Sequence, residues 1–305
     1  MSEPDYREVK VEEERRLLHS VVYWDLAAFG ALVGAGLGFL YGLGEGSRQR
    51  AFDVFAGMVI GALVVFASGW AKAQFRARER FFARWAAKRQ WAYEPSGEPF
   101  EDTPFLSSGD ERRASDFFSG FWTVPGVVLY QHKRIIGSGR SEQVSTFIVL
   151  HFSLDRPLID LLQIWPHSRS AELEEKLTGQ RGEIGERVDL ESTELMQCYR
   201  ISGPREQEDE VAKLLTPSAI VKILDFHRSL PGANSYFEIQ GMRVAFLVEK
   251  PLSPKRPELI EKLLELWEPL ATWLIDEAAA ANARAISSGE GTGAGLTETS
   301  ESEPS

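Results

Sequence analysis

The sequence has few of the residues and motifs on which enzymes and disulfide-stabilised proteins depend. Its single cysteine, Cys198, excludes an intramolecular disulfide framework and a four-cysteine zinc site. Four of its histidines, His132, His151, His167 and His227, occur in neither an H-x-x-x-H nor an H-E-x-x-H frame. No metal site is therefore expected, and the position of Cys198 is typical of a core residue in a strand.

Motifs for nucleophilic catalysis and phosphate binding are also missing. The segment 137–141 does not have the spacing of a nucleophile elbow and indicates a hairpin turn instead. There is no Walker, dinucleotide or kinase motif. We therefore predict a protein without enzymatic activity and without a cofactor.

Acidic residues outnumber basic ones outside one short stretch, and the formal net charge is −11. The region 92–284 and the tail 285–305 carry most of the excess acid. An acidic chain of this kind argues against nucleic acid as a partner. We also find no cleavable signal peptide, because the first apolar run is too long and lacks a cleavage site.

Two long apolar segments stand near the N-terminus. Residues 26–44 and 54–71 carry no charge, and a helix of the first segment would be roughly 28 Å long, close to the thickness of a bilayer core. A short polar break at 45–50 separates them, which predicts an antiparallel transmembrane hairpin within residues 21–72. Tyr23, Trp24 and Trp70 stand at the segment ends, where aromatic residues favour the membrane interface.

The distribution of lysine and arginine predicts the orientation of this hairpin. A basic helix over 73–92 would follow it, whereas the connecting loop has only Arg48 and Arg50. The charged arm 1–20 adds further cations and is expected to form a short surface helix that continues into the first apolar helix. The positive-inside rule therefore predicts that the hairpin spans the inner membrane and that both termini lie in the cytoplasm. The residues expected at lipid headgroups are Lys72, Arg76, Arg78, Arg80, Arg84, Lys88 and Arg89.

Glycine recurs at helical spacing in both apolar segments. The residues concerned are Gly30, Gly34, Gly38 and Gly42 in the first segment and Gly57 and Gly61 in the second. Glycine weakens a helix, so such rows indicate close approach of two helix backbones. Two arrangements remain open: the rows pack against each other within one hairpin, or one row is left for a second copy of the chain.

The region 93–284 predicts a cytosolic α+β domain with a mostly antiparallel sheet. Residues 93–113 are expected to be a linker or an irregular edge of the domain, and strand-like runs occupy 114–124, 127–132, 144–154, 158–165, 184–190 and 197–201. Helices are expected at 206–215 and 217–228, a hairpin at 236–249, and a long helix at 257–283 that Pro269 kinks or splits. The tail 285–305 has no apolar period and is expected to be disordered.

Several short motifs occur along this region. They are Phe105-Leu106 before Gly109, Gly120, Gly126-Val127, Glu191-Ser192, Glu194-Leu195, Tyr199-Arg200-Ile201, Leu214-Leu215 with Pro217, and Glu238-Ile239 with Gly241. In these positions the chain resembles a family of uncharacterised bacterial membrane proteins, in which a two-helix anchor precedes a cytosolic domain of unknown function. Leu195-Met196 departs from the Phe-Asn usual in the family, which puts any role of that asparagine in doubt. The resemblance implies the membrane topology and the shared domain but no activity.

Three functions remain open at this point. The favoured one is an integral membrane protein that presents an interaction domain to a cytosolic or membrane protein partner. The alternatives are a membrane-bound, hydrolase-like enzyme with a dispersed active site, and a hairpin oligomer that acts on the lipid bilayer.

Overall fold

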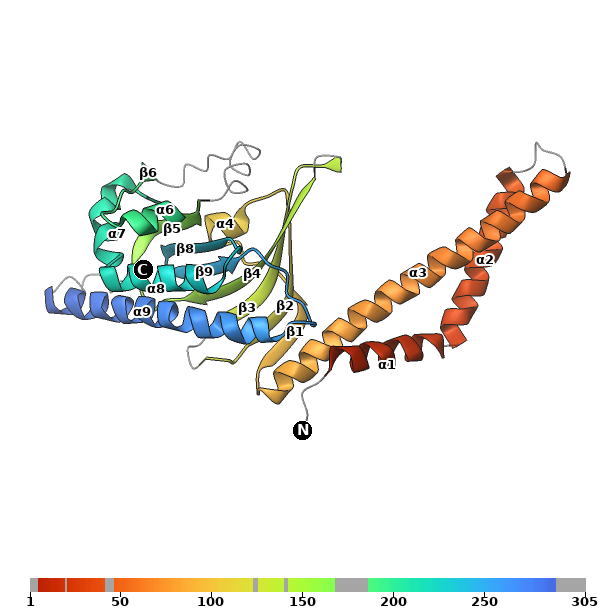
Figure 1. Cartoon of the computed structure of the whole chain (residues 1–305), viewed down its shortest axis with the longest axis horizontal. Helices are drawn as coiled ribbons and strands as arrows, with labels where there is room; N and C mark the ends of the chain where they lie inside the picture. Colours follow the sequence, from red (N-terminus) through yellow and green to blue (C-terminus); the bar gives the residue numbers. More distant parts are fainter. Residues whose placement is uncertain are drawn as a thin grey trace, which may run out of the picture. The chain divides into compact units, whose positions relative to one another are not determined.

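The computed structural model describes residues 5–19, 21–41, 47–122, 126–139, 142–167 and 186–288. The chain divides into two compact units, of which the first holds Met1–Pro95 with Ser253–Arg256 and the second holds the remainder. Helices come first and a nine-stranded sheet with further helices follows (Figure 1). The predicted α+β fold class is therefore confirmed.

The first unit contains three helices. Helix α1 (Tyr6–Leu18) begins at Asp5, whose carboxylate accepts a hydrogen bond from the backbone N–H of Arg7 at 2.8 Å. Helices α2 (Val21–Tyr41) and α3 (Ser47–Lys88) form the hairpin. The prediction that α1 continues into the first apolar helix is wrong, because α1 ends at Leu18 and its capping residue His19 separates it from α2.

Helix α3 is one continuous element in which the second apolar segment runs on into the basic stretch. Its 42 residues include the second apolar segment and the basic stretch that follows it. At about 1.5 Å per residue, the part after Ala71 extends the helix by roughly 25 Å. The helix ends near Gln90, which adopts a left-handed backbone with φ of 61°.

A nine-stranded sheet follows the helices; its first strand begins in the first unit and the other eight belong to the second. The strands are β1 (Ala92–Gly97), β2 (Glu111–Ser119), β3 (Val128–Ile136), β4 (Gln143–Ser153), β5 (Ile159–Pro166), β6 (Glu186–Arg187), β7 (Tyr199–Gly203), β8 (Ser235–Gly241) and β9 (Arg243–Val248). Their spatial order is β1-β2-β3-β4-β9-β8-β5-β7-β6. The register pairs of β2 to β9 are all antiparallel, as predicted.

Helices cover both faces of this sheet. The short helix α4 (Pro104–Ser107) lies on one face, where Phe105 contacts Phe147 and Tyr236. Helices α8 (Pro217–Ser229) and α9 (Glu258–Ser288) lie on the other, where Phe226 and Trp267 pack with Phe237 and Phe246 (Figure 1). Because consecutive residues of a strand point to opposite faces and both faces are covered, β9 is apolar from Val244 to Val248 and β8 is buried from Ser235 to Ile239.

Several predicted boundaries need correction. The stretch 93–113 is not a linker, since it contains most of β1, α4 and the start of β2. Helix α6 (Thr193–Cys198) holds Cys198, which was expected in a strand, and α7 (Glu208–Leu214) fits the predicted helix. Residues 285–288 of the expected disordered tail belong to α9, and the rest of the tail lies outside the described residues.

Pro269 neither splits nor ends α9, which runs without interruption from Glu258 to Ser288. Proline removes one backbone hydrogen bond, and the carbonyl it frees is that of Glu265, four residues earlier. Both Pro269 and Glu265 are exposed, so water can hydrate that carbonyl. The buried stripe that includes Trp267 and Leu270 supplies the packing that keeps the helix together.

Candidate functional site

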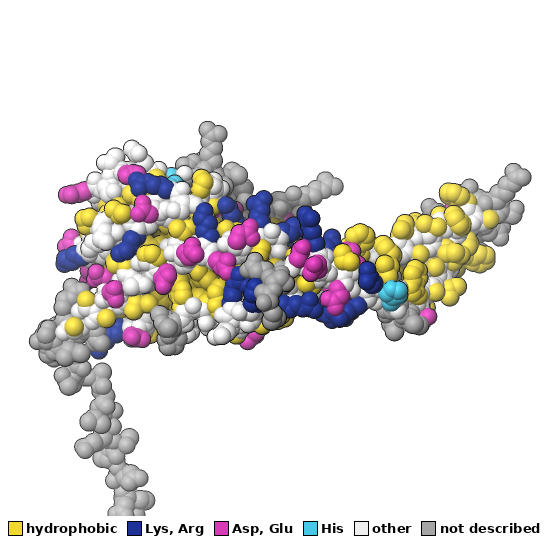
Figure 2. Space-filling view, turned by 60° about the horizontal axis from the view of Figure 1, so that its bottom comes forward, with side chains coloured by type: hydrophobic (Ala, Val, Ile, Leu, Met, Phe, Trp, Pro, Cys, Tyr) yellow, Lys and Arg dark blue, Asp and Glu magenta, His cyan; other side chains and the backbone are white. Residues whose placement is uncertain are grey.

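The outer surface of the hairpin is apolar on every described side. Large apolar side chains point away from the protein, as their exposed fractions show: 65% for Phe29, 70% for Leu32, 63% for Phe55 and 61% for Ile60. Figure 2 shows hydrophobic side chains covering the hairpin, while charged side chains gather beyond it. A water-soluble surface rarely carries an apolar patch of this extent.

Among the described residues, one helix is long and apolar enough to cross a membrane. It is the helix that contains Ala51–Lys88, with a mean hydropathy of 2.1 over its most apolar window. The described apolar stretch of α2, Trp24–Leu40, is shorter than that criterion requires. Length and composition therefore identify a single candidate span.

The predicted glycines occupy the contact between α2 and α3. A Cβ atom built on Gly34 would lie within 3.0 Å of the backbone of Gly57, and a Cβ atom built on Gly30 would lie within 3.0 Å of the backbone of Gly61. Gly38 approaches the backbone of Asp53 and Val54 in the same way. Gly42 lies outside the described residues, whereas Gly36, on the same helix, has open space around it. The rows of the two helices therefore face each other within one chain.

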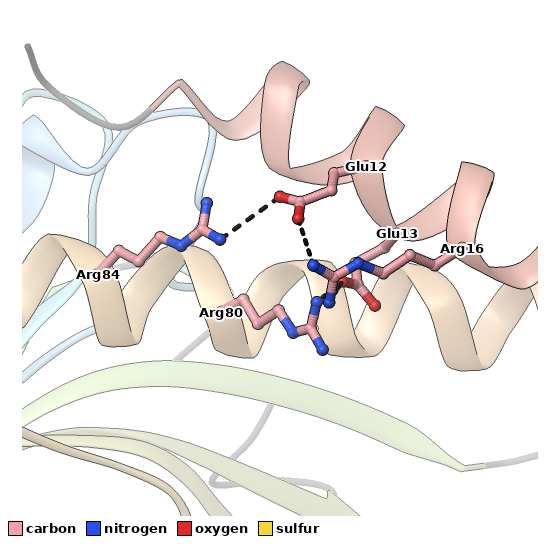
Figure 3. A network of polar contacts seen from close by, with 5 residues as sticks. All are labelled: Glu12, Glu13, Arg16, Arg80 and Arg84. Atoms are coloured by element: carbon pink, nitrogen blue, oxygen red, sulfur yellow. Dashed lines mark hydrogen bonds and ion pairs between the residues drawn. The ribbon is translucent and has the colours of Figure 1, made fainter.

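Helix α1 lies along the basic half of α3, and we call these two helical segments, Tyr6–Leu18 and residues 72–88, the stalk. Glu13 of α1 is 4% exposed and forms an ion pair with Arg80 of α3 (Figure 3). Glu12 lies 3.4 Å from Arg84, and Gln74 donates a hydrogen bond to Glu14 at 2.6 Å.

Apolar contacts complete the stalk. The ring of Tyr6 meets Phe81 edge-on at 5.7 Å, and Val9 is buried. Burial raises the pKa of Tyr6, whereas the positive charge of Arg78 opposes that rise. The polar contacts join Glu14 to Gln74 and Glu12 to Arg84, so α1 runs antiparallel to α3. The sequence offered one signal for this pairing, the acidic run Glu12–Glu14 opposite a basic helix.

The seven cations predicted at lipid headgroups occupy different environments in the stalk. Arg80 and Arg84 contact acids of α1. Arg78 lies over the ring of Phe82 at 5.5 Å, and Arg89 over the ring of Trp85 at 4.1 Å. The remaining three are exposed: Lys72, Arg76 and Lys88.

A buried polar cluster occupies the α4 face of the sheet. Glu238 of β8 is 1% exposed and accepts hydrogen bonds from the backbone N–H of Phe105, at 3.0 and 3.2 Å, and from the amide of Gln163. Burial raises the pKa of Glu238, and hydrogen bonds from Thr103 and Gln163 oppose that rise. Each polar group of the cluster is thus satisfied by a neighbour in the same domain.

A second group lies on the same face, where β4 and β9 meet. His151 Nε2 lies 3.0 Å from both carboxylate oxygens of Asp102, and its ring stacks on Phe100 at 4.1 Å. Burial would raise the pKa of Asp102, but the hydrogen bond and charge of His151 and the charge of Arg243 together lower it. Arg243 also donates to Ser153, so that hydroxyl is engaged with the guanidinium.

The possible metal ligands and the single cysteine do not come together in one site among the described residues. Within the part of the chain that the structure describes, no group of three or more His, Cys, Asp or Glu could hold a metal ion. Cys198 is half-buried at the end of α6. Sequence reasoning did not find the Glu238 and Asp102 clusters, because their members come from strands and loops far apart in the chain.

Comparison with known proteins gives little further information. No family model matches the chain, and no curated protein is similar to it in sequence. One solved structure, the crystal structure of the mycobacterial trehalose monomycolate transport factor A, TtfA, matches with a TM-score of 0.41 and 11% identity, covering 66% of this chain and 94% of that one. A match this distant supports no argument about function, and the resemblance to a family of bacterial membrane proteins stays a prediction.

Proposed function

We propose that the chain is an integral membrane protein whose hairpin spans the bilayer twice and whose α+β domain binds a partner in the cytoplasm. The observation that supports this most is the outward-facing apolar surface of α2 and α3. These helices contact each other through glycine backbones and leave their leucine, isoleucine and phenylalanine side chains exposed. Lipid is the environment in which such a surface is stable.

The two-span topology is supported by the length of the contact between the helices. Gly30 is next to Gly61 and Gly38 is next to Asp53, so the contact follows most of α2. Because α2 packs along α3, the two helices lie at the same depth in the bilayer if α3 spans it. The 21 residues of α2 correspond to about 31 Å, which is sufficient to cross the hydrocarbon core.

The cytoplasmic orientation follows from the charge of the stalk. Arginine and lysine are concentrated after Ala71, while the connecting loop contributes Arg48 and Arg50. The satisfied polar clusters of the domain favour a binding role over catalysis, because their carboxylates are already engaged by protein donors.

Reporter fusions test the topology directly. A cytoplasm-specific reporter after Ser305 should be active, and a periplasm-specific reporter inserted in the loop 45–50 should also be active. The reverse pattern would contradict the orientation. A loop reporter on the same side as the C-terminus would contradict the second span.

A further inference from the structure

The stalk separates the cations of α3 into two groups according to their distance from the apolar segment. At about 1.5 Å per residue, Lys72 lies about 1.5 Å and Arg76 about 7.5 Å beyond Ala71. Arg80 and Arg84 lie about 13 Å and about 20 Å beyond it. A headgroup layer is roughly 5–7.5 Å thick on each side of the hydrocarbon core, so only the first group, Lys72 and Arg76, lies within its depth.

Helix α1 brings a third cation to this depth. The contact of Glu14 with Gln74 places the neighbouring residue Arg15 beside the stretch between Lys72 and Arg76. All three cations are exposed, and within the described residues none of them forms an ion pair. Arg16, by contrast, is held by Glu12 at 2.6 Å.

The acids near this level offset only part of the positive charge, because Glu14 is paired with Lys10 and, among the described residues, Asp25 alone remains near the three cations. Glu14 is engaged by Gln74 at 2.6 Å and by Lys10 at 3.7 Å. Asp25 of α2 is exposed near the same end of the hairpin. Farther along the stalk, Glu12 and Glu13 are opposite Arg80 and Arg84, so that the distal cations already have acidic partners.

We propose that Arg15, Lys72 and Arg76 form a binding site for the headgroups of anionic phospholipids, and that Arg80 and Arg84 instead hold α1 in place. The site rests on the proposed membrane insertion. Its selectivity comes from the negative charge of the lipid phosphate, because neutral zwitterionic headgroups offer no net attraction to three cations. Polybasic segments beside a membrane helix gain about 1 kcal/mol for each lysine or arginine near an anionic surface.

The test uses the full chain in a neutral detergent, titrated with phosphatidylglycerol or phosphatidylcholine of the same acyl chains. Native mass spectrometry counts the lipids that stay bound. The chain should retain phosphatidylglycerol in preference to phosphatidylcholine. The variant K72Q/R76Q should lose about thirtyfold in affinity for phosphatidylglycerol, the change that about 1 kcal/mol per cation corresponds to.

The matched control is K88Q/R89Q, which removes two cations at the far end of α3, about 26 Å from Ala71, that in the described structure contact neither α1 nor the proposed lipid site. It should keep the preference for phosphatidylglycerol. Equal retention of the two lipids by the unmodified chain would overturn the site, as would equal losses in the two variants. Release of the unmodified chain from membranes by alkaline carbonate would instead contradict the proposed membrane insertion.

Discussion

Burial without a hydrogen bond determines the behaviour of His132. The side chain is 0% exposed, and neither ring nitrogen has a hydrogen-bond partner within the described structure. Burial, together with the positive charges of Arg134 and Arg112, lowers the pKa of His132 to about 4, and the negative charge of Glu101 opposes this only in part. The imidazole is therefore neutral at physiological pH and behaves as an aromatic core residue.

The pH dependence of stability follows from this shift. An unfolded chain binds a proton on histidine near pH 6.5, whereas the folded chain does so only near pH 4. The contribution of neutral His132 to the free energy of unfolding is thus complete above pH 6.5. It is lost as the pH falls towards 4, which lowers the free energy of unfolding by up to about 3 kcal/mol. We expect H132F to be close to the unmodified protein at neutral pH and to lose less stability on acidification, as measured by denaturant unfolding at a series of pH values.

His151 provides the contrasting variant. It is also buried, but its ring contacts Asp102 at 3.0 Å. H151F should therefore destabilise the protein at neutral pH by about 1–3 kcal/mol, because the carboxylate loses its partner. If H132F lost as much stability between pH 6.5 and 4 as the unmodified protein does, the account of His132 would be wrong.

At the scale of secondary-structure elements, the hairpin depends on backbone contact between α2 and α3. Gly34 lies against Gly57 with no space for a Cβ atom, whereas Gly36 has nothing within 4 Å. Gly34→Leu should force the helices apart and cost about 1–3 kcal/mol. Gly36→Leu should be tolerated. The thermal unfolding of the two variants in the same detergent measures the difference, and equal effects would show that the close contact does not support the hairpin.

The docking of α1 depends on one buried acid more than on its neighbours. Glu13 is 4% exposed, while Glu12 is 38% exposed and its partner Arg84 is 52% exposed. Glu13→Gln should weaken the α1–α3 contact by about 1–2 kcal/mol, because Arg80 loses its ion pair at a partly buried site. Glu12→Gln should change it by less than about 0.5 kcal/mol. Hydrogen exchange of the α1 amides reports the docking, and a larger effect of Glu12 would contradict this ranking.

These elements also show which parts of the fold the sequence can predict. The hairpin and the strands β4, β8 and β9 follow from apolar periodicity and turn residues within each segment. Strand β1 and helix α4 were missed, because proline, glycine and acidic residues hide their short apolar stretches. The docking of α1 on α3 and the Glu238 cluster depend on residues that are 60 or more positions apart, such as Glu13 with Arg80 and Phe105 with Glu238. Local patterns do not identify the residues that meet in such contacts, and for α1 and α3 they show only an acidic run in one helix and a basic stretch in the other.

At the scale of the whole molecule, exposed apolar side chains divide the chain into two regions. Large exposed hydrophobic residues are concentrated between Trp24 and Phe75, in the hairpin and the start of the stalk. Beyond β1, the large exposed hydrophobic residues of the described structure are Val144, Val221 and Met242. The sheet domain buries its aromatic residues on both faces, under α4 and under α8 and α9. Insolubility in water should therefore be a property of the hairpin alone.

A fragment of residues 92–288 tests this division, because it retains all nine strands and their covering helices. We expect it to be folded and monodisperse without detergent, whereas the full chain should require detergent, as size-exclusion chromatography with light scattering would show. Circular dichroism provides the control that the fragment is folded. A fragment that is folded but disperses only in detergent would mean that the sheet domain itself has a membrane-binding surface, and the assignment of membrane contact to the hairpin and stalk alone would then be wrong.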